Sequence, residues 1–384
     1  MRKMTRSGSK DDILFPVEFS TGYSIIPSMS TINIVYGTNI TEMTCTLLRE
    51  SDVAKRLTAG MNVVIKPNLV VAKPAAEGAV THPEIVEGIV LFLKENHVSS
   101  ITVAEGSWLG ETTTRAFDRC GYSALAKKYG IKLVDTKNDH VVKKTAGDLT
   151  LGVCETMLNA EFLINVPVLK GHCQTTMTCC LKNMKGCIPD SEKRRYHNIG
   201  LHQPIAALNT ILKPHLHVID SICGDPTFEE GGNPVQTDRI LLGTDPVLLD
   251  SYGAMLLGYD PGEIDYLRIA ARLGIGNIAG ANTEICELQQ ERRPKTRPAN
   301  QSQLVRRFAK QIDEQNACSA CYAALICALR QLGSVSAKVG KINIGQAFRN
   351  QQCAGFGIGN CCSGCDRHVP GCPPTAARIL EALR

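Results

Sequence analysis

Cysteines near the end of the chain are the residues whose spacing most clearly indicates chemistry. The chain has 17 cysteines, and six stand in two short stretches near the end, namely Cys318, Cys321, Cys361, Cys362, Cys365 and Cys372. A C-x-x-C turn lets two thiolates face one metal centre, and glycine and proline shape loops that supply further ligands. Four thiolates suit either tetrahedral zinc or a cubane iron–sulfur cluster.

The two kinds of site use these cysteines differently. A zinc ribbon would combine the first C-x-x-C pair with Cys362 and Cys365. It would leave Cys361 and Cys372, the latter inside "PGCPP", without a role. A cubane cluster is therefore the leading prediction, with zinc and unligated or redox-active thiols as alternatives.

A resemblance supports the cluster. The segments "CSAC", "GIGNCC" and "VPGCPPTAARILEAL" resemble the proximal-cluster segments of nickel–iron hydrogenase small subunits and of the equivalent complex I subunit. Carried over residue by residue, the resemblance implies a [4Fe–4S] cluster held by Cys318, Cys321 and Cys372. One middle ligand remains to be chosen from Cys361, Cys362 and Cys365. The rest of the hydrogenase small subunit is not recognisable here.

A second chemical motif is "NVPVLKGHCQTTMTCCLKNMKGCIPD". It places Lys170 and His172 directly after a predicted strand, and Thr178, Lys182 and Asn183 along a probable helix start. Lysines grouped with hydroxyls and amides can hold a carboxylate or a phosphate. The alternative is that the lysines are solvated surface charges and His172 caps a loop.

Four further polar residues follow predicted strands. Lys66 and Asn68 come after "NVVI", Glu105 ends "SITVAE", and Asp220 lies in "HVIDSI" before the acidic, glycine-rich "CGDPTFEEGGNP". Glu105 or His172 could move a proton near neutral pH. Asp220 and its loop could position a cation or a substrate hydroxyl, or could form a polar turn.

Four cysteines inside the second motif could form another metal site, namely Cys173, Cys179, Cys180 and Cys187. Adjacent residues on a helix point about 100° apart, which makes it awkward for Cys179 and Cys180 to bind one ion. Small buried thiols are the alternative. Asp250 is predicted to cap a helix.

These residues are positioned by an alternation of strands and helices. Apolar runs such as "NVVIKPNLV" are typical of buried parallel strands, and "THPEIVEGIVLFLKENH", with Thr81 as a candidate N-cap and Pro83 in its first turn, predicts a helix. "SDVAKRLTAG" and "TTRAFDRCGYSALAKKYG" predict two more. The pattern indicates a doubly wound, mostly parallel sheet, which binds ligands beyond the carboxyl ends of its strands.

This part of the chain resembles a family catalogued as domain of unknown function 362. The resemblance rests on "IKPNL", "THPEIVEGIV", "AEGS", "VPVLKGH" followed by "LKNMKG", "HVIDSI" and "DPVLLD", in order over residues 31 to about 275. Many members carry ferredoxin-type clusters after this domain, and the resemblance implies no assigned reaction.

Composition sets the remaining expectations. Residues 1–30 are predicted as a lead-in, 31–286 as the α/β domain, 287–311 as a basic linker and 312–384 as a cysteine-rich segment. The start of the chain lacks a secretory pattern and no apolar run is long enough for a membrane span, which favours the cytoplasm and reduced thiols. The linker is basic but poor in aromatic residues, which argues against nucleic-acid binding.

A net charge of +5 suits an anionic ligand. We therefore expect an iron–sulfur oxidoreductase or electron-transfer protein that acts on an anionic small molecule and exchanges electrons with a redox partner protein. The alternative is a non-catalytic iron–sulfur carrier or sensor, or a zinc-binding protein.

Overall fold

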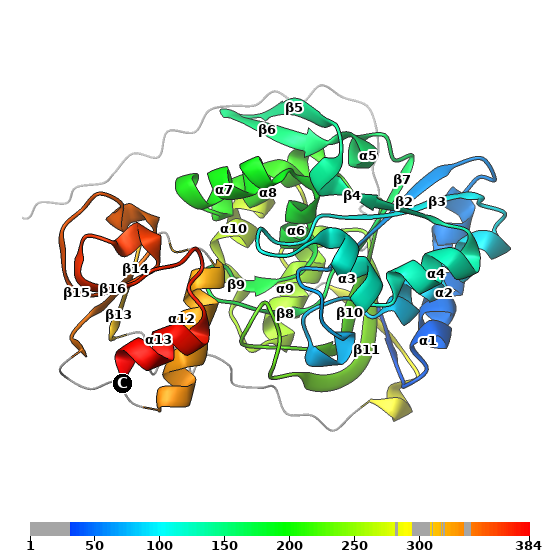
Figure 1. Cartoon of the computed structure of the whole chain (residues 1–384). Coiled ribbons are helices and arrows are strands. Elements are labelled where there is room, and N and C mark those ends of the chain that lie inside the picture. The colour runs from blue at the N-terminus through cyan, green and yellow to red at the C-terminus, as the bar shows by residue number, and fades with distance from the viewer. Residues whose placement is uncertain are drawn as a thin grey trace, which may run out of the picture.

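The largest element of the computed structural model is an eight-stranded sheet with strand order β12-β1-β11-β10-β7-β2-β3-β4 (Figure 1). The structure describes residues 31–280, 283–293, 308, 310–315, 317, 319–333 and 339–384. The strands are β1 (Thr31–Tyr36), β2 (Asn62–Pro67), β3 (Ser100–Glu105), β4 (Lys132–Asp135), β7 (Phe162–Val166), β10 (Leu216–Gly224), β11 (Val235–Gly243) and β12 (Glu284–Leu288). Only β11 runs antiparallel to its neighbours. The predicted doubly wound, mostly parallel sheet is therefore confirmed.

Helices cover both faces of this sheet. Its central strands β2 and β7 are therefore buried along nearly their whole length, as is typical of parallel sheets. One face packs against α1 (Ile40–Arg49), α2 (Pro83–Glu95), α3 (Thr113–Arg119) and α4 (Tyr122–Tyr129). The other packs against α6 (Cys180–Asn183), α8 (His202–Ile211), α9 (Pro246–Leu256) and α10 (Asp265–Arg272). The short α5 (Glu155–Leu158) and the amphipathic α7 (Asp190–Ile199) complete the set.

Three predicted helix boundaries differ from the structure. The helix expected over residues 51–60 is only a short 3-10 turn, Asp52–Arg56, and the regular helix is α1, just before it. The hydroxyl of Thr81 donates to Val166 O instead of capping α2, whose N-cap is His82, while Pro83 does start the helix. Gly121, with φ of 85°, divides the next predicted helix into α3 and α4.

Two small antiparallel hairpins belong to the α/β domain but lie outside its main sheet. One is β5 (Val141–Ala146) with β6 (Leu149–Cys154), and the other is β8 (Lys170–His172) with β9 (Thr176–Thr178). The second hairpin sets Lys170 opposite Thr178 and His172 opposite Thr176. Two residues of the predicted anion-binding motif are thereby paired across a turn.

The cysteine-rich segment forms its own lobe, called here the tail lobe (residues 312–384). Four parallel strands, β13 (Ile312–Glu314), β14 (Ile342–Ile344), β15 (Cys353–Ile358) and β16 (Cys365–Val369), pack with α12 (Ser319–Leu332) and α13 (Ala376–Leu383). Phe228, from a loop of the α/β domain, joins the lobe's apolar core. The lobe therefore packs directly on the main domain (Figure 1).

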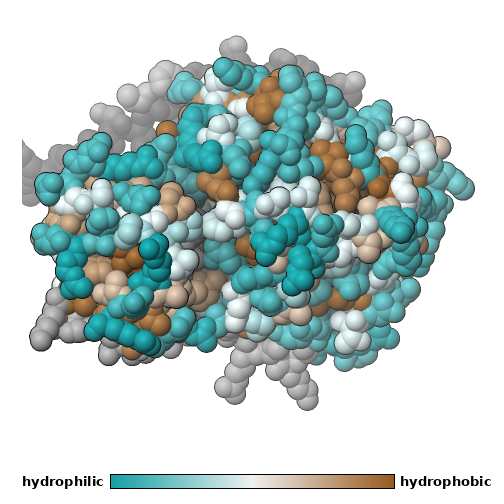
Figure 2. All heavy atoms as spheres, viewed as in Figure 1, coloured by the Kyte–Doolittle hydropathy of each residue, from teal (hydrophilic) through white to brown (hydrophobic). Residues whose placement is uncertain are grey.

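Two predicted segments fall largely outside the described residues. These are the lead-in, 1–30, and most of the basic linker, of which 294–307 are not described. Strand β12 pairs with β1 and extends the main sheet to Leu288, past the predicted boundary at 286. Hydrophilic residues cover most of the face drawn in Figure 2, and hydrophobic residues form separate small patches there. In the described part of the chain, no helix has the length and apolar character needed to span a bilayer.

Candidate functional site

The carboxyl ends of β2 and β3 place two opposite charges in contact. Lys66 Nζ forms an ion pair with a carboxylate oxygen of Glu105, and their side chains are 1% and 4% exposed. Lys66 Nζ also donates to Asn183 Oδ1 at 3.3 Å. A Cβ atom on Gly186 would lie 2.1 Å from Glu105 Oε1, so the turn after α6 approaches this pair closely only because residue 186 is glycine. Three of the predicted site residues therefore lie together.

A chain of buried amides extends from this ion pair. Asn68 Nδ2 donates to Asn183 Oδ1 at 2.8 Å, and Asn183 Nδ2 donates to Asn165 Oδ1 at 2.7 Å. Asn165, at the end of β7, was not predicted as a site residue, although the strand-end argument applied to it equally. Because each amide both donates and accepts, the orientation of Asn183 is fixed.

Lys170 is fully buried and uses its ammonium group within the protein. Its Nζ atom donates to Asn68 Oδ1 at 3.1 Å, to Ala79 O at 2.5 Å and to Glu229 O at 2.9 Å. Burial lowers the pKa of Lys170 to about 8. All three donor positions of the ammonium have acceptors, so Lys170 holds the loop around Glu229 in place.

Glu229 is the centre of a second buried charge cluster. Its carboxylate accepts from Lys182 Nζ at 2.5 Å and lies 3.1 Å from His172 Nε2, while Lys182 also donates to Thr178 Oγ1 at 3.1 Å. Burial favours the neutral acid, but the charge of Lys182 and the hydrogen bond from His172 outweigh it and hold the pKa of Glu229 well below its usual range. The predicted cations are thus partnered by a carboxylate from the acidic, glycine-rich loop.

His172 is held as a neutral donor. Its Nδ1 atom accepts from the backbone amide of Thr175 at 3.1 Å, which places the ring proton on Nε2, facing Glu229. Burial, with the nearby charge of Lys182, lowers the pKa of His172 to about 4. The ring does not line the cavity described below and contacts it only through Glu229.

Asp220 lies apart from these clusters. Its Oδ2 atom accepts from the backbone amide and from Nδ1 of His82, both at 2.8 Å. Burial opposes a charge on His82, but Asp220 outweighs burial and raises the pKa of that ring. Asp220 does not line the cavity and fixes the start of α2 instead.

A cavity of about 390 Å³ lies where the α/β domain meets the tail lobe. The α/β domain contributes most of its polar lining, namely Asn68, Glu105, Thr178, Lys182, Asn183, Lys185, Lys193, Arg194, His197 and Glu229, together with Trp108, the single tryptophan of the chain. The tail lobe contributes Cys321, Gln346, Arg349, Cys372 and Pro373. A volume of this size suits a small organic ligand.

Helix α7 supplies cavity residues that the sequence analysis missed. Lys193 is buried and donates to Gly106 O and Ser107 O at 3.0 and 2.9 Å. His197, one turn further, has a buried Nδ1 atom with no hydrogen-bond partner among the described residues, and burial lowers its pKa to about 2. The four-residue spacing of Lys193 and His197, just after the "LKNMKG" motif, was the available signal.

Cysteines from both ends of the tail lobe reach this cavity. Cys321, in the first turn of α12, and Cys372 both line it. A Cβ atom on Gly359, whose φ is 86°, would lie 3.7 Å from Cys321 Sγ and 3.4 Å from Gly371 O. Asn360 N donates to Gly371 O at 3.0 Å, and Gly371 N donates to Asn360 Oδ1 at 2.7 Å. The loops that carry Cys361 and Cys372 are therefore tied side by side, and Cys318 lies outside the described residues.

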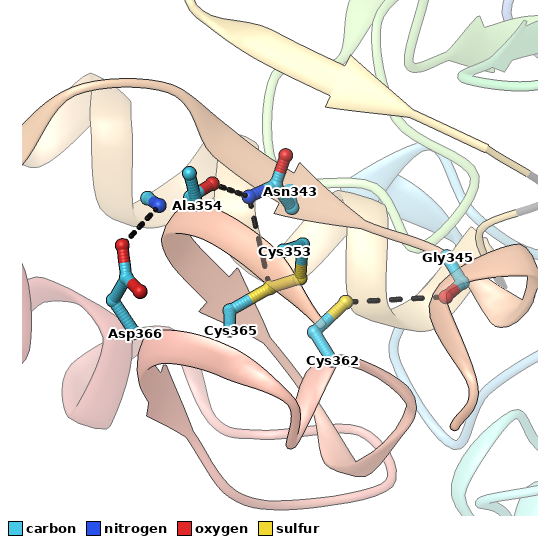
Figure 3. The surroundings of a disulfide bond; sticks show 8 residues. Asn343, Gly345, Cys353, Ala354, Cys362, Cys365 and Asp366 are labelled. Carbon is cyan, nitrogen blue, oxygen red and sulfur yellow. Dashed lines mark hydrogen bonds between the residues drawn. A yellow bond between two sulfur atoms is a disulfide. The ribbon is translucent and has the colours of Figure 1, made fainter. Parts of the chain in front are cut away.

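The three candidates for the middle ligand have different surroundings. Cys361 is partly exposed, and its Sγ atom accepts from Arg349 Nε at 3.3 Å. Cys362 is buried and faces Gly345 O, beside a disulfide between Cys353 and Cys365 (Figure 3). Cys365 is therefore bonded to another sulfur atom, and only Cys361 is in contact with a residue that lines the cavity.

The four cysteines of the second motif do not converge on one point. Cys173 packs against the tail core, while Cys187 lies next to the charges of Lys66 and Glu105. Cys179 and Cys180 lie together, with their sulfur atoms 3.9 Å apart. The 100° argument does not apply to them, because Cys179 precedes α6 and has an extended backbone, with φ of −155°.

Comparisons with known proteins found similarity over part of the chain. The Thylakoid-associated protein sll1697 of Synechocystis sp. is 25% identical over 238 residues, which cover 58% of this chain and 71% of that protein. The lactate racemase apoprotein from Thermoanaerobacterium thermosaccharolyticum aligns with 12% identity and a TM-score of 0.38, over 58% of this chain. The chain spans little more than half of that structure, 56%.

The family comparison covers half of the chain. The model of the domain of unknown function DUF362 matches residues 63–255. The match runs from β2 to α9 and contains both buried charge clusters and the residues of the α/β domain that line the cavity. The chain belongs to the DUF362 family.

Proposed function

We propose that this protein binds a [4Fe–4S] cluster through the tail lobe and exchanges electrons with an anionic small molecule held in the adjoining cavity. One observation carries the proposal: Cys321 and Cys372 line the same cavity as Lys182 and Asn183. Cysteine segments that are distant in the sequence thus meet the basic motif of the α/β domain.

The donor set fits a cubane. Cys321, in the first turn of α12, and the segments that carry Cys361 and Cys372 meet around Gly359, where a side chain would contact Cys321 Sγ and Gly371 O. With Cys318, which precedes α12, they would supply four thiolates. Cys361 is the better middle ligand, because it contacts Arg349 on the cavity wall, while Cys362 is buried away from the cavity and Cys365 faces Cys353 on the neighbouring strand.

When bound, an all-thiolate cluster of this type supplies single electrons, usually at low potential. The chain's own residues would hold and orient the second reactant. Lys182 and Lys185 would attract its anionic group, with Thr178 and Asn183 as directed hydrogen-bond partners. Glu105, at the cavity wall and paired with Lys66, would accept or return a proton, and His172 would act only by orienting Glu229.

The cluster is tested by anaerobic purification. Iron and acid-labile sulfide should be present in about equal amounts, near four of each per chain, with an electron paramagnetic resonance signal after reduction. Cys372→Ser should remove the iron, while Cys362→Ser, the matched control in the neighbouring loop, should retain it. Colourless protein with stoichiometric zinc in the tail lobe would contradict the proposal.

The ligand site is tested separately. Lys182→Ala should weaken the binding of small carboxylates, followed through the fluorescence of Trp108, and should leave the iron content unchanged. Trp108→Phe removes the reporter and serves as its control. Unchanged carboxylate binding in Lys182→Ala would contradict this part of the proposal.

A non-catalytic carrier or sensor is the second candidate, and the exposure of Cys372 favours it. A cluster near the surface is accessible to a partner protein. Cluster transfer to an apo-acceptor without redox cycling would support this candidate, whereas a redox partner protein belongs to the first. A cytoplasmic location, where free thiols stay reduced, is part of both proposals.

A further inference from the structure

Cys179, Cys180 and Asp250 form a compact group of metal-ligating side chains behind the cavity wall. All three residues are fully buried, and their ligand atoms lie within 4.8 Å of one another. Asp250 comes from α9, whereas the cysteines stand at the start of α6. Two separate elements therefore converge on one point.

The spacing of the sulfur atoms matches one metal. A Zn–S distance near 2.3 Å in tetrahedral geometry places two thiolates about 3.8 Å apart, and Cys179 Sγ and Cys180 Sγ are 3.9 Å apart. We propose that Cys179, Cys180 and Asp250 bind a zinc ion that fixes α6 to α9. This site is distinct from the tail lobe and does not rest on the proposed function.

A fourth polar group points to a missing partner at this place. The hydroxyl of Tyr266, in α10, is buried and has no hydrogen-bond partner among the described residues. Tyr266 packs in the same buried core as Cys179 and Cys180. A buried hydroxyl without a partner is costly. A water molecule as fourth zinc ligand would give it one.

A cation would also resolve the protonation of the group. A divalent ion makes thiolates the stable form and releases their protons. The ion would offset two of the three negative charges of its ligands, and the backbone amides of Cys180 and Leu181 already face the third, on Asp250.

The site would support the cavity wall. Asp250 already accepts from the backbone amides of Cys180 and Leu181, at 2.6 and 3.1 Å, so its carboxylate holds the first turn of α6. The same short helix carries Lys182 and Asn183 into the cavity. Zinc would make this attachment stronger and would keep both side chains in register with the charge clusters.

Zinc content in the reduced full chain tests the proposal. Ser replacements remove all eight tail-lobe thiols as competing ligands, namely Cys318, Cys321, Cys327, Cys353, Cys361, Cys362, Cys365 and Cys372. This variant, incubated with Zn²⁺ and desalted, should retain about one zinc per chain, and Co²⁺ should give thiolate charge-transfer absorption. No retained metal would overturn the proposal.

Further replacements in this background locate the ion. Adding Cys179→Ser/Cys180→Ser should remove the zinc, whereas Cys173→Ser/Cys187→Ser, the matched control in the same motif, should keep it. Asp250→Asn retains an acceptor for α6 and tests the site without removing sulfur. It should weaken zinc binding by at least about tenfold. Zinc retained at full affinity in Asp250→Asn, or at full stoichiometry in the double serine variant, would overturn the assignment.

Discussion

The α/β wall of the cavity pairs its charges with one another, whereas the tail wall presents sulfur atoms on adjoining loops. Lys66 pairs with Glu105 and Lys182 with Glu229, all at least partly buried, and buried amides connect the two pairs. In the tail lobe, Cys372 is exposed and Cys321 and Cys361 are partly exposed. The charges of these two pairs are thus satisfied within the α/β domain, whereas the tail wall offers donor atoms to something else.

The difference indicates which wall depends on a ligand. A preorganised polar network keeps its geometry without a bound molecule. A lobe as small as residues 312–384 has a limited apolar core, and domains of this size commonly rely on metals or disulfides. We therefore expect substitution of the buried charges to destabilise the α/β domain, and loss of the metal to destabilise the tail lobe.

The largest effect is expected at the buried ion pair. Lys66→Met leaves the carboxylate of Glu105 buried beside Gly186 without its ion-pair partner, which should reduce the free energy of unfolding by about 3–5 kcal/mol. Urea unfolding followed by circular dichroism measures it. The double variant Lys66→Met/Glu105→Gln should recover most of the lost free energy of unfolding, because neither charge of the pair remains. Equal losses in both variants would show that the pair has no electrostatic role in stability.

The pH dependence of stability tests the second charge cluster. The folded protein resists protonation of His172 until about pH 4, because burial lowers the pKa of the ring, whereas the unfolded chain binds that proton near pH 6.5. The contribution of His172 to the free energy of unfolding should therefore be full above about pH 6.5 and fall by roughly 3 kcal/mol on the way to pH 4. Buried His197, whose pKa is also lowered, adds a loss over the same range. Glu229, whose pKa is held low, acts in the same direction.

A substitution separates His172 from the other groups. His172→Gln should flatten the fall in stability between pH 6.5 and pH 4. The control is His140→Gln. The side chain of His140 is 70% exposed, so this variant should show the same pH dependence of the free energy of unfolding as the unaltered protein. An equal slope in the His172 variant would mean that the ring is not held neutral by burial.

The fold and half of the site follow from local patterns in the sequence. Apolar runs and turn residues predicted the parallel sheet, and the rule that ligands meet strand ends predicted Lys66, Asn68 and Glu105. It placed Asp220 there as well, but the carboxylate instead binds His82, a residue 138 positions earlier. The position of a residue at the end of a strand does not by itself determine which partner its side chain binds.

The missed residues required tertiary information. Glu229 lies in a loop whose acidic and glycine-rich character was noted, yet its partners are His172 in β8 and Lys182 in α6, the nearer of them 47 positions earlier in the chain. Cys365 and Cys353 stand opposite each other in β15 and β16, and this register is not visible in C-x-x-C spacing. Sequence spacing identifies candidate ligands, but strand pairing selects among them.

The third test adds one methyl group at Gly359 and compares its effect on the tail lobe with its effect on the α/β domain. Gly359, with φ of 86°, lies where the Cys321 and Cys372 segments meet. Gly359→Ala should cost about 1–3 kcal/mol locally and should lower the iron content, while urea unfolding of the α/β domain stays unchanged. Gly340→Ala, at φ of 70° with open space around it, is the control and should keep its iron. Iron lost equally in both variants would indicate that general strain in the tail lobe is responsible.

The smallest effect is expected at Arg349, which lines the cavity and donates a hydrogen bond to Cys361 Sγ. Hydrogen bonds to cluster sulfurs raise the reduction potential, so Arg349→Ala should keep its iron and shift the potential to lower values. A hydrogen bond of about 1 kcal/mol corresponds to roughly 40 mV for one electron. Arg367→Ala removes the same charge from the tail lobe, where the guanidinium lies over Phe356 and does not contact Cys361. A redox titration followed by electron paramagnetic resonance should therefore show a larger shift for Arg349→Ala, and equal shifts would reduce its role to general charge.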